Sequence, residues 1–128
     1  MAGAGGTSWS EVEMHRTRNE VLKDTAAAFR DWGIPTADAI VDIRSEFPEA
    51  TLIASGGLKN GIDIAKCIAL GASMGGMAHG FLTAAADSAE KLLEKLEILS
   101  RQFRTVMFAT GSKNIEDLRN RKIKKYRQ

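Results

Sequence analysis

The sequence has one cysteine, two prolines and few aromatic residues, and these scarcities narrow what the chain can be. Cys67 has no second cysteine to pair with, so no internal disulfide can form and we expect a reducing, cytoplasmic setting. No apolar run is long enough to cross a bilayer, and the small, polar first residues differ from a secretory leader. We therefore expect a soluble globular chain without a membrane partner.

Charge is nearly balanced, because the net charge is only +2. A balance this close to zero gives no reason to expect a nucleic-acid partner. The basic residues nevertheless gather in a tail over residues 119–128: Arg119, Arg121, Lys122, Lys124, Lys125 and Arg127. Such a tail can be a solvated terminus or can touch RNA or acidic lipid. Tyr126 is the only aromatic residue among these charges, which favours the solvated terminus.

The stretch 52–79 organises the chain. Its apolar run 52–54 is typical of a strand buried on both faces, and a second small-residue strand is expected over 73–77. Between them, Asn60 is placed to cap a helix over 61–70, and Gly71 provides a left-handed stop. This alternation of buried strand and helix is the α/β pattern, in which the strands are parallel.

Both expected strands run into turns of small residues, and this predicts an anion site. Gly56, Gly57 and Leu58 follow the first strand, and Ala78 and His79 follow the second. Unpaired N–H groups and helix dipoles converge at two such strand ends, which suits a phosphate. In (β/α)8 barrels the common phosphate site lies after the last two strands. Tight packing of helix on strand explains the glycines equally well, so both interpretations stay open.

Helices are expected on both sides of this stretch. Their predicted signals are a capping box from Ser10 to Glu13, an apolar face along 20–31, a Thr36 cap for 37–44, a capping box from Asp87 for a long helix through Val106, and an Asn114 cap for a last short helix. The long helix places Leu92, Leu96, Leu99 and Phe103 on one side, with Gly111 at its end.

Few other residues carry a chemical signal. His79 can serve as a catalytic base or, more simply, as a structural donor, and His15 is expected at the surface. Cys67 is interpreted as core filler rather than as a reactive thiol. We find no zinc pattern, nucleophile elbow or Walker loop. An ordinary barrel needs roughly 250 residues, so a chain of 128 residues suits only part of one.

Several segments together resemble type 2 isopentenyl diphosphate isomerase, over nearly the whole chain but only the C-terminal part of that family. They are residues 2–9 (AGAGGTSW), 32–36 (WGIPT), 54–61 (ASGGLKNG), 76–78 (GMA) and 104–111 (RTVMFATG). The resemblance implies an FMN-dependent (β/α)8 TIM barrel that interconverts isopentenyl and dimethylallyl diphosphate. The complete enzyme also needs Mg²⁺ and NADPH.

The same resemblance implies site residues. Thr7 corresponds to a flavin contact, Gly56, Gly57 and Leu58 to one phosphate loop, and Ala78 and His79 to the other. The family often has glycine where this chain has His79. Metal and substrate ligands belong to the family's N-terminal half, so no metal ligand and no catalytic residue is assigned here. We expect residues 1–128 to form one partial barrel domain that holds the flavin phosphate and is inactive alone.

Four interpretations follow. The chain is part of an enzyme that needs a complementing N-terminal half before it meets the isoprenoid diphosphate, or it is a flavin-binding module that forms a homo-oligomer through its strand edges. Alternatively, it is a remnant that folds poorly, or it belongs to another FMN-dependent TIM-barrel oxidoreductase.

Overall fold

A computed structural model describes residues 9–30 and 32–124, and helix α4 (Gly61–Ala69) lies at the centre of its main body. Asn60 is the N-cap, and its Oδ1 accepts a hydrogen bond from the Asp63 amide at 2.9 Å. Gly71 has φ 111°, a left-handed conformation that ends the helix and that a residue with a Cβ adopts only under strain. Both predicted boundary signals of this helix are confirmed.

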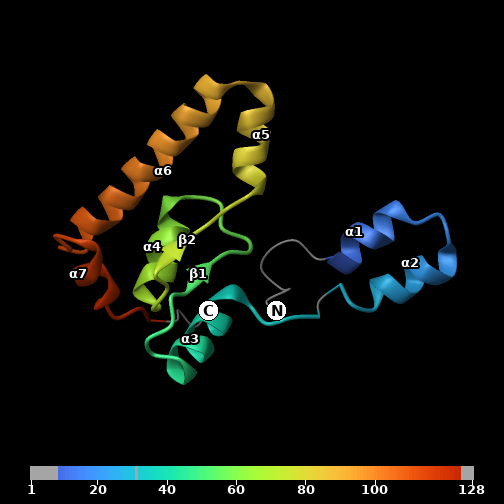
Figure 1. Cartoon of the computed structure of the whole chain (residues 1–128), viewed down its shortest axis with the longest axis horizontal. Helices are drawn as coiled ribbons and strands as arrows, with labels where there is room; N and C mark the ends of the chain where they lie inside the picture. The colour runs from blue at the N-terminus through green and yellow to red at the C-terminus, as the bar shows by residue number, and fades with distance from the viewer. Residues whose placement is uncertain (1–8, 31, 125–128) are drawn as a thin grey trace.

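Helix α4 connects the two strands of a parallel sheet (Figure 1). Strand β1 (Ile53–Ala54) pairs with β2 (Met74–Gly75) so that Ile53 faces Met74 and Ala54 faces Gly75. The pairing continues at the strand ends, where the Gly76 amide donates to the Ala54 carbonyl at 2.8 Å. The predicted β-α-β unit with parallel strands is therefore present.

Two apolar clusters flank α4. One joins Ile40, Ala54, Cys67 and Ala72, and so packs α3 (Thr36–Glu46) and β1 against α4. The other joins Ala65 and Ile68 of α4 with Leu118 of α7 (Ile115–Arg119). Partly buried residues of α6 (Ala89–Ala109) pack against this cluster. Since α4 contributes to both clusters and also contacts β2, it joins the sheet to α3, α6 and α7.

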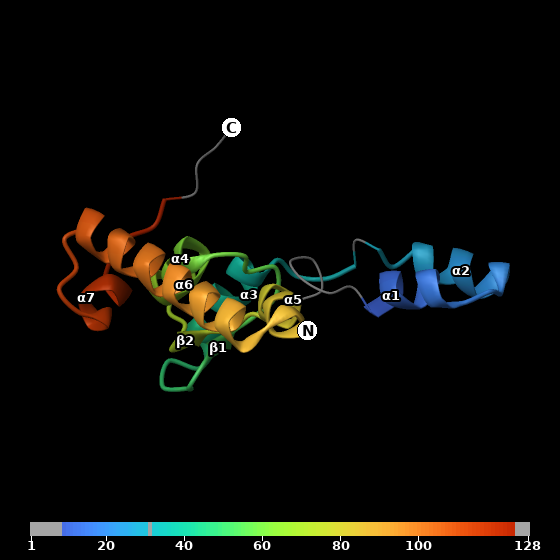
Figure 2. The same cartoon turned by 90° about the horizontal axis from the view of Figure 1, so that it is seen from above.

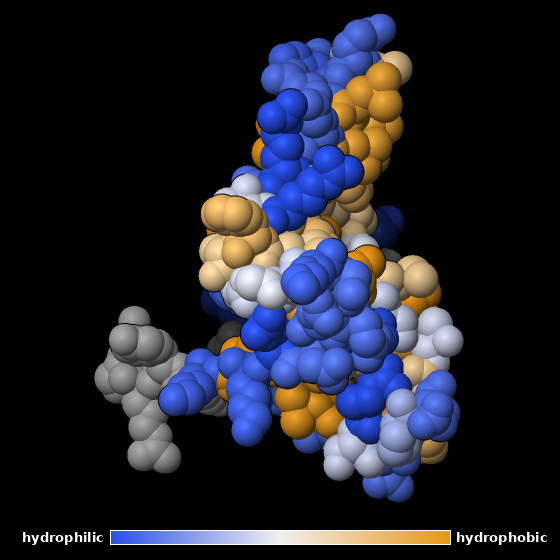
Figure 3. Space-filling view, turned by 90° about the vertical axis from the view of Figure 1, so that its left-hand side faces the viewer, coloured by the Kyte–Doolittle hydropathy of each residue, from blue (hydrophilic) through white to orange (hydrophobic). Residues whose placement is uncertain are grey.

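The long helix α6 packs on α4 and on α5 (His79–Asp87). Its contact with α4 is unusually close at Gly61, where an added Cβ would meet the Leu99 carbonyl and lie 2.8 Å from the Phe103 nitrogen. Only glycine fits at that crossing. Seen from the α7 side, the surface is mainly hydrophilic, and hydrophobic residues gather along one side of the upper helix pair (Figure 3).

Helices α1 (Trp9–Arg16) and α2 (Glu20–Ala27) form a hairpin that packs mainly on itself. Both views place this hairpin beside the main body (Figures 1 and 2). Among the described residues, a hydrogen bond of 3.0 Å from the Ser10 hydroxyl to the Phe29 carbonyl joins its two ends. None of the helices in the described ranges has the length and apolarity needed to cross a membrane.

Some predicted details of the strands and of α2 are wrong. The strands are shorter than 52–54 and 73–77, and Ile53 is 60% exposed, so β1 is buried on one face only. Helix α2 ends at Ala27 rather than continuing to 31, and no residue of it is buried. Leu22 of α2 and Phe29 just after it belong to the predicted apolar face along 20–31, yet they are 53% and 46% exposed.

Three predicted helix caps are also wrong. Ser10 lies inside α1. Thr36 is the first residue of α3 rather than its cap, and its hydroxyl donates to the Gly56 carbonyl at 2.8 Å. Ser88 rather than Asp87 caps α6, since its Oγ accepts from the Lys91 amide at 3.1 Å. By contrast, Asn114 caps α7 as predicted.

Candidate anion site at the strand ends

The carboxyl ends of β1 and β2 lie at the same edge of the sheet, because the strands are parallel and in direct register. The loop after β1 turns at Gly56, with φ 111°, and at Gly57, with φ 73°. These conformations expose backbone N–H groups without a Cβ in the way. The Thr36 hydroxyl holds the Gly56 carbonyl and so fixes how this loop leaves the strand.

The amides of this first loop are available to a ligand. Within the described part of the chain, no group accepts a hydrogen bond from the backbone N–H of Gly56, Gly57 or Leu58. The amides just downstream are already engaged. Lys59 N donates to the Asp63 carboxylate at 3.1 Å, and Gly61 N donates to Gln102 Oε1 at 2.9 Å. The donors for an anion are therefore those of the glycine turn, and α4 supplies its dipole behind them.

The second loop leads directly into α5. Ala78 is the N-cap, without a side-chain cap, and His79 is the first residue of the helix. The Ala78 carbonyl accepts from the Phe81 and Leu82 amides at 3.1 and 2.8 Å. No described residue accepts from the amides of Ala78, His79 or Gly80. An anion here would meet main-chain donors and a helix N-terminus.

Side chains near the two loops carry both signs of charge. Asp63, in the first turn of α4, lies 3.8 Å from the Lys66 ammonium, which offsets its charge. The His79 side chain is exposed, and no described group holds it in a hydrogen bond or ion pair. The structure thus gives His79 no orienting partner for a catalytic base, while its amide remains well placed for an anion.

The other singled-out residues fall outside this site. Cys67 is buried, as predicted, and burial together with the Asp63 carboxylate raises the pKa of its thiol, which disfavours the reactive thiolate. His15 is exposed, as expected. Among the residues with described side chains, no group of three His, Cys, Asp or Glu could hold a metal ion. Thr7 lies outside the described residues.

The start of the basic tail is held in place, whereas its last four residues lie outside the described chain. Arg121 donates to the Gly111 carbonyl at 2.6 Å and to the Ser112 hydroxyl at 3.2 Å. Arg119 pairs with the Glu116 carboxylate. The part of the tail up to Arg121 is therefore held against the protein rather than frayed.

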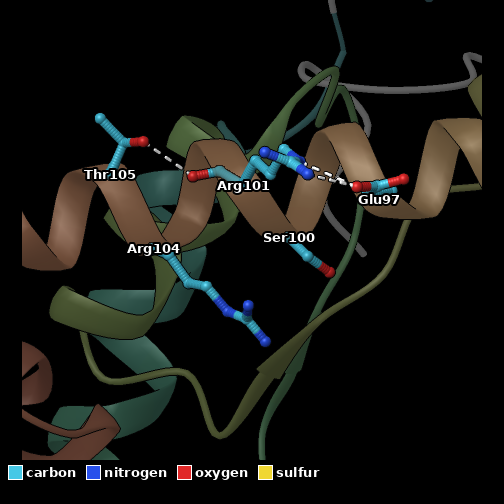
Figure 4. Close-up of a pocket in the computed structure, with 5 residues that line it drawn as sticks. All are labelled: Glu97, Ser100, Arg101, Arg104 and Thr105. Carbon is cyan, nitrogen blue, oxygen red and sulfur yellow. Dashed lines mark hydrogen bonds and ion pairs between the residues drawn. The ribbon is translucent and has the colours of Figure 1, made fainter.

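An open hollow lined by polar residues lies on the surface of α6, and no residue of the two loops lines it (Figure 4). Arg101 and Glu97 form an ion pair of 2.6 Å on one side of the helix. Ser100 and Arg104 point to the other side. All of its lining side chains are exposed, so the hollow contains no buried polar group.

Sequence reasoning missed two residues that shape the site. Gln102 binds the first amide of α4 from 41 residues downstream, and no local pattern marks that contact. The other is Thr36, for which the sequence predicts a helix cap, whereas its hydroxyl holds the Gly56 loop, and only the tertiary fold brings it there.

The fold is that of an α/β protein with parallel strands, and the amides left without an acceptor at the carboxyl ends of those strands make a candidate anion site. The sequence model of the FMN-dependent dehydrogenase family matches residues 29–125, and this chain belongs to that family. A crystal structure of a Pediococcus acidilactici protein described as a lactate oxidase has the same fold, with a TM-score of 0.68 and 20% identity, over 94% of this chain and 34% of that one. The architecture is compatible with part of a (β/α)8 barrel.

The curated relatives give a narrower comparison. An isopentenyl-diphosphate delta-isomerase of Archaeoglobus fulgidus is 48% identical over 96% of this chain and 35% of its own length. That of Pseudescherichia vulneris is 47% identical over 97% of this chain and 36% of its own length. The chain thus spans about a third of the length of the relatives it matches. The resemblance to isopentenyl diphosphate isomerases is confirmed at this level.

Proposed function

We propose that this chain is the C-terminal portion of an FMN-dependent, type 2 isopentenyl-diphosphate delta-isomerase and supplies the flavin phosphate site. The observation that carries the proposal is the 48% identity to the A. fulgidus isomerase over 96% of this chain. Membership of the FMN-dependent dehydrogenase family supports FMN as the cofactor. The backbone fits its phosphate, because free amides follow both strands and two glycines adopt positive φ values.

In this proposal, the amides of Gly56, Gly57 and Leu58 hold the phosphate from one side, and those of Ala78 and His79 from the other. A hydrogen bond to a charged group contributes about 1.5–3 kcal/mol, so a few of them account for measurable binding. Thr7 would contact the flavin itself. Resemblance alone supports this last assignment.

In this proposal, isomerisation of the isoprenoid diphosphate requires a complete barrel. We propose that the chain is inactive by itself and that Mg²⁺ and NADPH serve only the assembled enzyme. A complementing N-terminal half would supply the remaining ligands. The second assembly that we propose is a homo-oligomer. We expect either assembly in the cytoplasm. Support for these points is the chain's share of about 35% of the A. fulgidus relative, together with the resemblance.

The phosphate site can be tested by titrating FMN and riboflavin with the purified chain while following flavin fluorescence anisotropy. We expect FMN to bind and riboflavin, which lacks the phosphate, to bind at least about tenfold more weakly, a difference of about 1.4 kcal/mol. Gly57→Ala should abolish the preference, because φ 73° strains a residue with a Cβ.

A matched control separates the site from general strain. Gly111 has φ 65° at the end of α6, so Gly111→Ala introduces similar strain away from the loops and should keep the preference for FMN. Equal binding of FMN and riboflavin, or no binding of FMN by a folded chain, would show that these loops do not form a phosphate site unaided.

A further inference from the structure

Lys95 of helix α6 lies against the start of helix α5, beside the second strand-end loop. A Cβ added at Gly80 would lie 3.7 Å from Lys95 Cε. In a helix the Cα–Cβ bond tilts toward the N-terminus, so this contact places the end of the lysine side chain next to the first turn of α5. Helices α5 and α6 pack on each other, and this brings a residue from well downstream to the loop (Figure 1).

The charge of Lys95 has no partner on its own helix. Side chains three and four positions apart on a helix are neighbours, and at those positions Lys95 has a lysine and three apolar residues: Lys91, Leu92, Ile98 and Leu99. By contrast, Lys91 pairs with Glu94 at 2.9 Å and Arg101 with Glu97 at 2.6 Å. Lys95 is half-buried, and its ammonium has no hydrogen bond or ion pair within the described chain. A cation held in this way is available to a bound anion.

The start of α5 is unusual for a helix N-terminus. Its N-cap, Ala78, has no side-chain acceptor, although that position favours Ser, Thr, Asp or Asn, and the first turn holds no acidic residue. The amides of His79 and Gly80 have no acceptor among the described residues. A helix N-terminus carries partial positive charge, and a cation beside it is unfavourable. The lysine and the uncapped amides therefore oppose each other until an anion lies between them.

We propose that Lys95 is a further ligand of the phosphate, and that its ammonium binds the phosphate oxygens from the α6 side of the second loop. The inference rests on the proposed function and deepens it, since it adds a charged side chain to a site otherwise built from backbone amides. A phosphate monoester carries about −1.5 to −2 charge at pH 7, and one ammonium neutralises part of it. Hydrogen bonds between two charged groups are also stronger than those between neutral groups.

The alternative role for Lys95 is packing, in which its apolar stem covers Gly80 and its ammonium is hydrated. Removing the charge while keeping an apolar side chain distinguishes the two roles. A packing role predicts no change in FMN binding. A ligand role predicts weaker FMN binding together with a ligand-free chain that is more stable, because the repulsion at the start of α5 is relieved.

The experiment titrates FMN and riboflavin with the Lys95→Met chain at low salt, by flavin fluorescence anisotropy. We expect FMN to bind about three- to tenfold more weakly than to the wild-type chain and riboflavin to bind unchanged. The difference for FMN should shrink as salt is added, because salt screens charges near the surface. Lys95→Arg keeps the charge and should keep FMN binding. Lys95→Gln repeats the test if Lys95→Met does not fold, as judged by circular dichroism.

Lys113→Met is the matched control. Lys113 is exposed and lies beyond the other end of α6, so this variant removes the same charge away from the loop and should leave FMN binding unchanged. The melting temperature of the ligand-free chain is the second measurement. Lys95→Met should raise it on the order of 1–4 °C at low salt, and the rise should fall as salt is added.

Three results would overturn the inference: equal FMN binding by Lys95→Met and the wild-type chain, equal weakening of FMN and riboflavin, or the same loss in Lys113→Met. A wild-type chain without a preference for FMN would instead contradict the proposed function. Inorganic phosphate then decides the role of Lys95 without flavin. A phosphate ligand at Lys95 means that phosphate raises the melting temperature of the wild-type chain more than that of Lys95→Met, and equal shifts would rule it out.

Discussion

At the scale of single residues, the site depends on groups that touch no ligand. Gly61 is the clearest case, because α6 crosses its Cα so closely that backbone atoms of Leu99 and Phe103 occupy the space of a side chain. Its amide also donates to Gln102 Oε1 at 2.9 Å. One glycine thus allows α4 and α6 to meet and fixes the start of the helix behind the Gly56–Gly57 turn.

We predict that Gly61→Ala destabilises the chain by about 1–3 kcal/mol, the usual cost of forcing an extra carbon into a packed contact. The neighbours are backbone atoms, so they cannot move aside by changing rotamer. Urea unfolding followed by circular dichroism measures the effect. Gly80→Ala is the control, since its Cβ would lie 3.7 Å from Lys95 Cε, an ordinary contact. Equal stability of the two variants would contradict the close crossing.

At the scale of elements, the sequence predicts best what is decided locally. The Asn60 and Asn114 caps and the Gly71 and Gly111 stops are confirmed, because each depends on residues within a few positions. The caps predicted at Ser10, Thr36 and Asp87 are wrong, and at Thr36 the cause is a distant acceptor, because the hydroxyl donates to the Gly56 carbonyl instead. The strand lengths and the Gln102 contact depend on distant segments, so local patterns could not give them.

The cap of α4 gives a prediction at this scale. Asn60→Ala should lower the free energy of unfolding by about 0.5–2 kcal/mol, since the Asp63 amide loses its acceptor. It should also weaken the preference for FMN over riboflavin, because the glycine turn leads directly into this cap. Asn114→Ala removes the equivalent cap of α7, where Oδ1 accepts from the Asp117 amide at 2.8 Å, and should lower stability alone.

Both cap variants should lower stability, so only their flavin binding distinguishes the cap of α4 from that of α7. If both variants weaken the preference for FMN to the same extent, the loss follows general destabilisation and the cap of α4 has no particular part in the site. Binding is therefore measured well below the unfolding midpoint of each variant, by the same anisotropy titration.

At the scale of the whole molecule, the chain divides into a main body around α4 and the α1–α2 hairpin beside it (Figures 1 and 2). The hairpin exposes apolar residues, among them Val21 at 74% and Trp32, just after it, at 76%. Its helices are short, and short helices gain most of their stability from packing. The two parts should therefore differ in local stability.

We predict that amide hydrogen exchange in the intact chain is fastest in α1 and α2 and slowest in α4, around Ala65, Cys67 and Ile68. Buried residues surround these α4 amides, whereas α2 has none, so α2 opens at a lower free energy. Mass spectrometry of the exchanged chain reads out both parts in one sample. Protection of α2 equal to that of α4 would contradict the division, and protection that rises with protein concentration would indicate association through the hairpin.

The hydrogen bond from Gly61 to Gln102 also has a consequence for synthesis. The two residues are 41 positions apart, so the ribosome adds α6 well after the glycine turn and α4 have been made. At 5–20 residues per second, the delay is on the order of 2–8 s. Until then the first turn of α4 lacks its anchor, and the nascent chain cannot complete the proposed phosphate loop. Flavin should therefore join this polypeptide only after translation has passed α6.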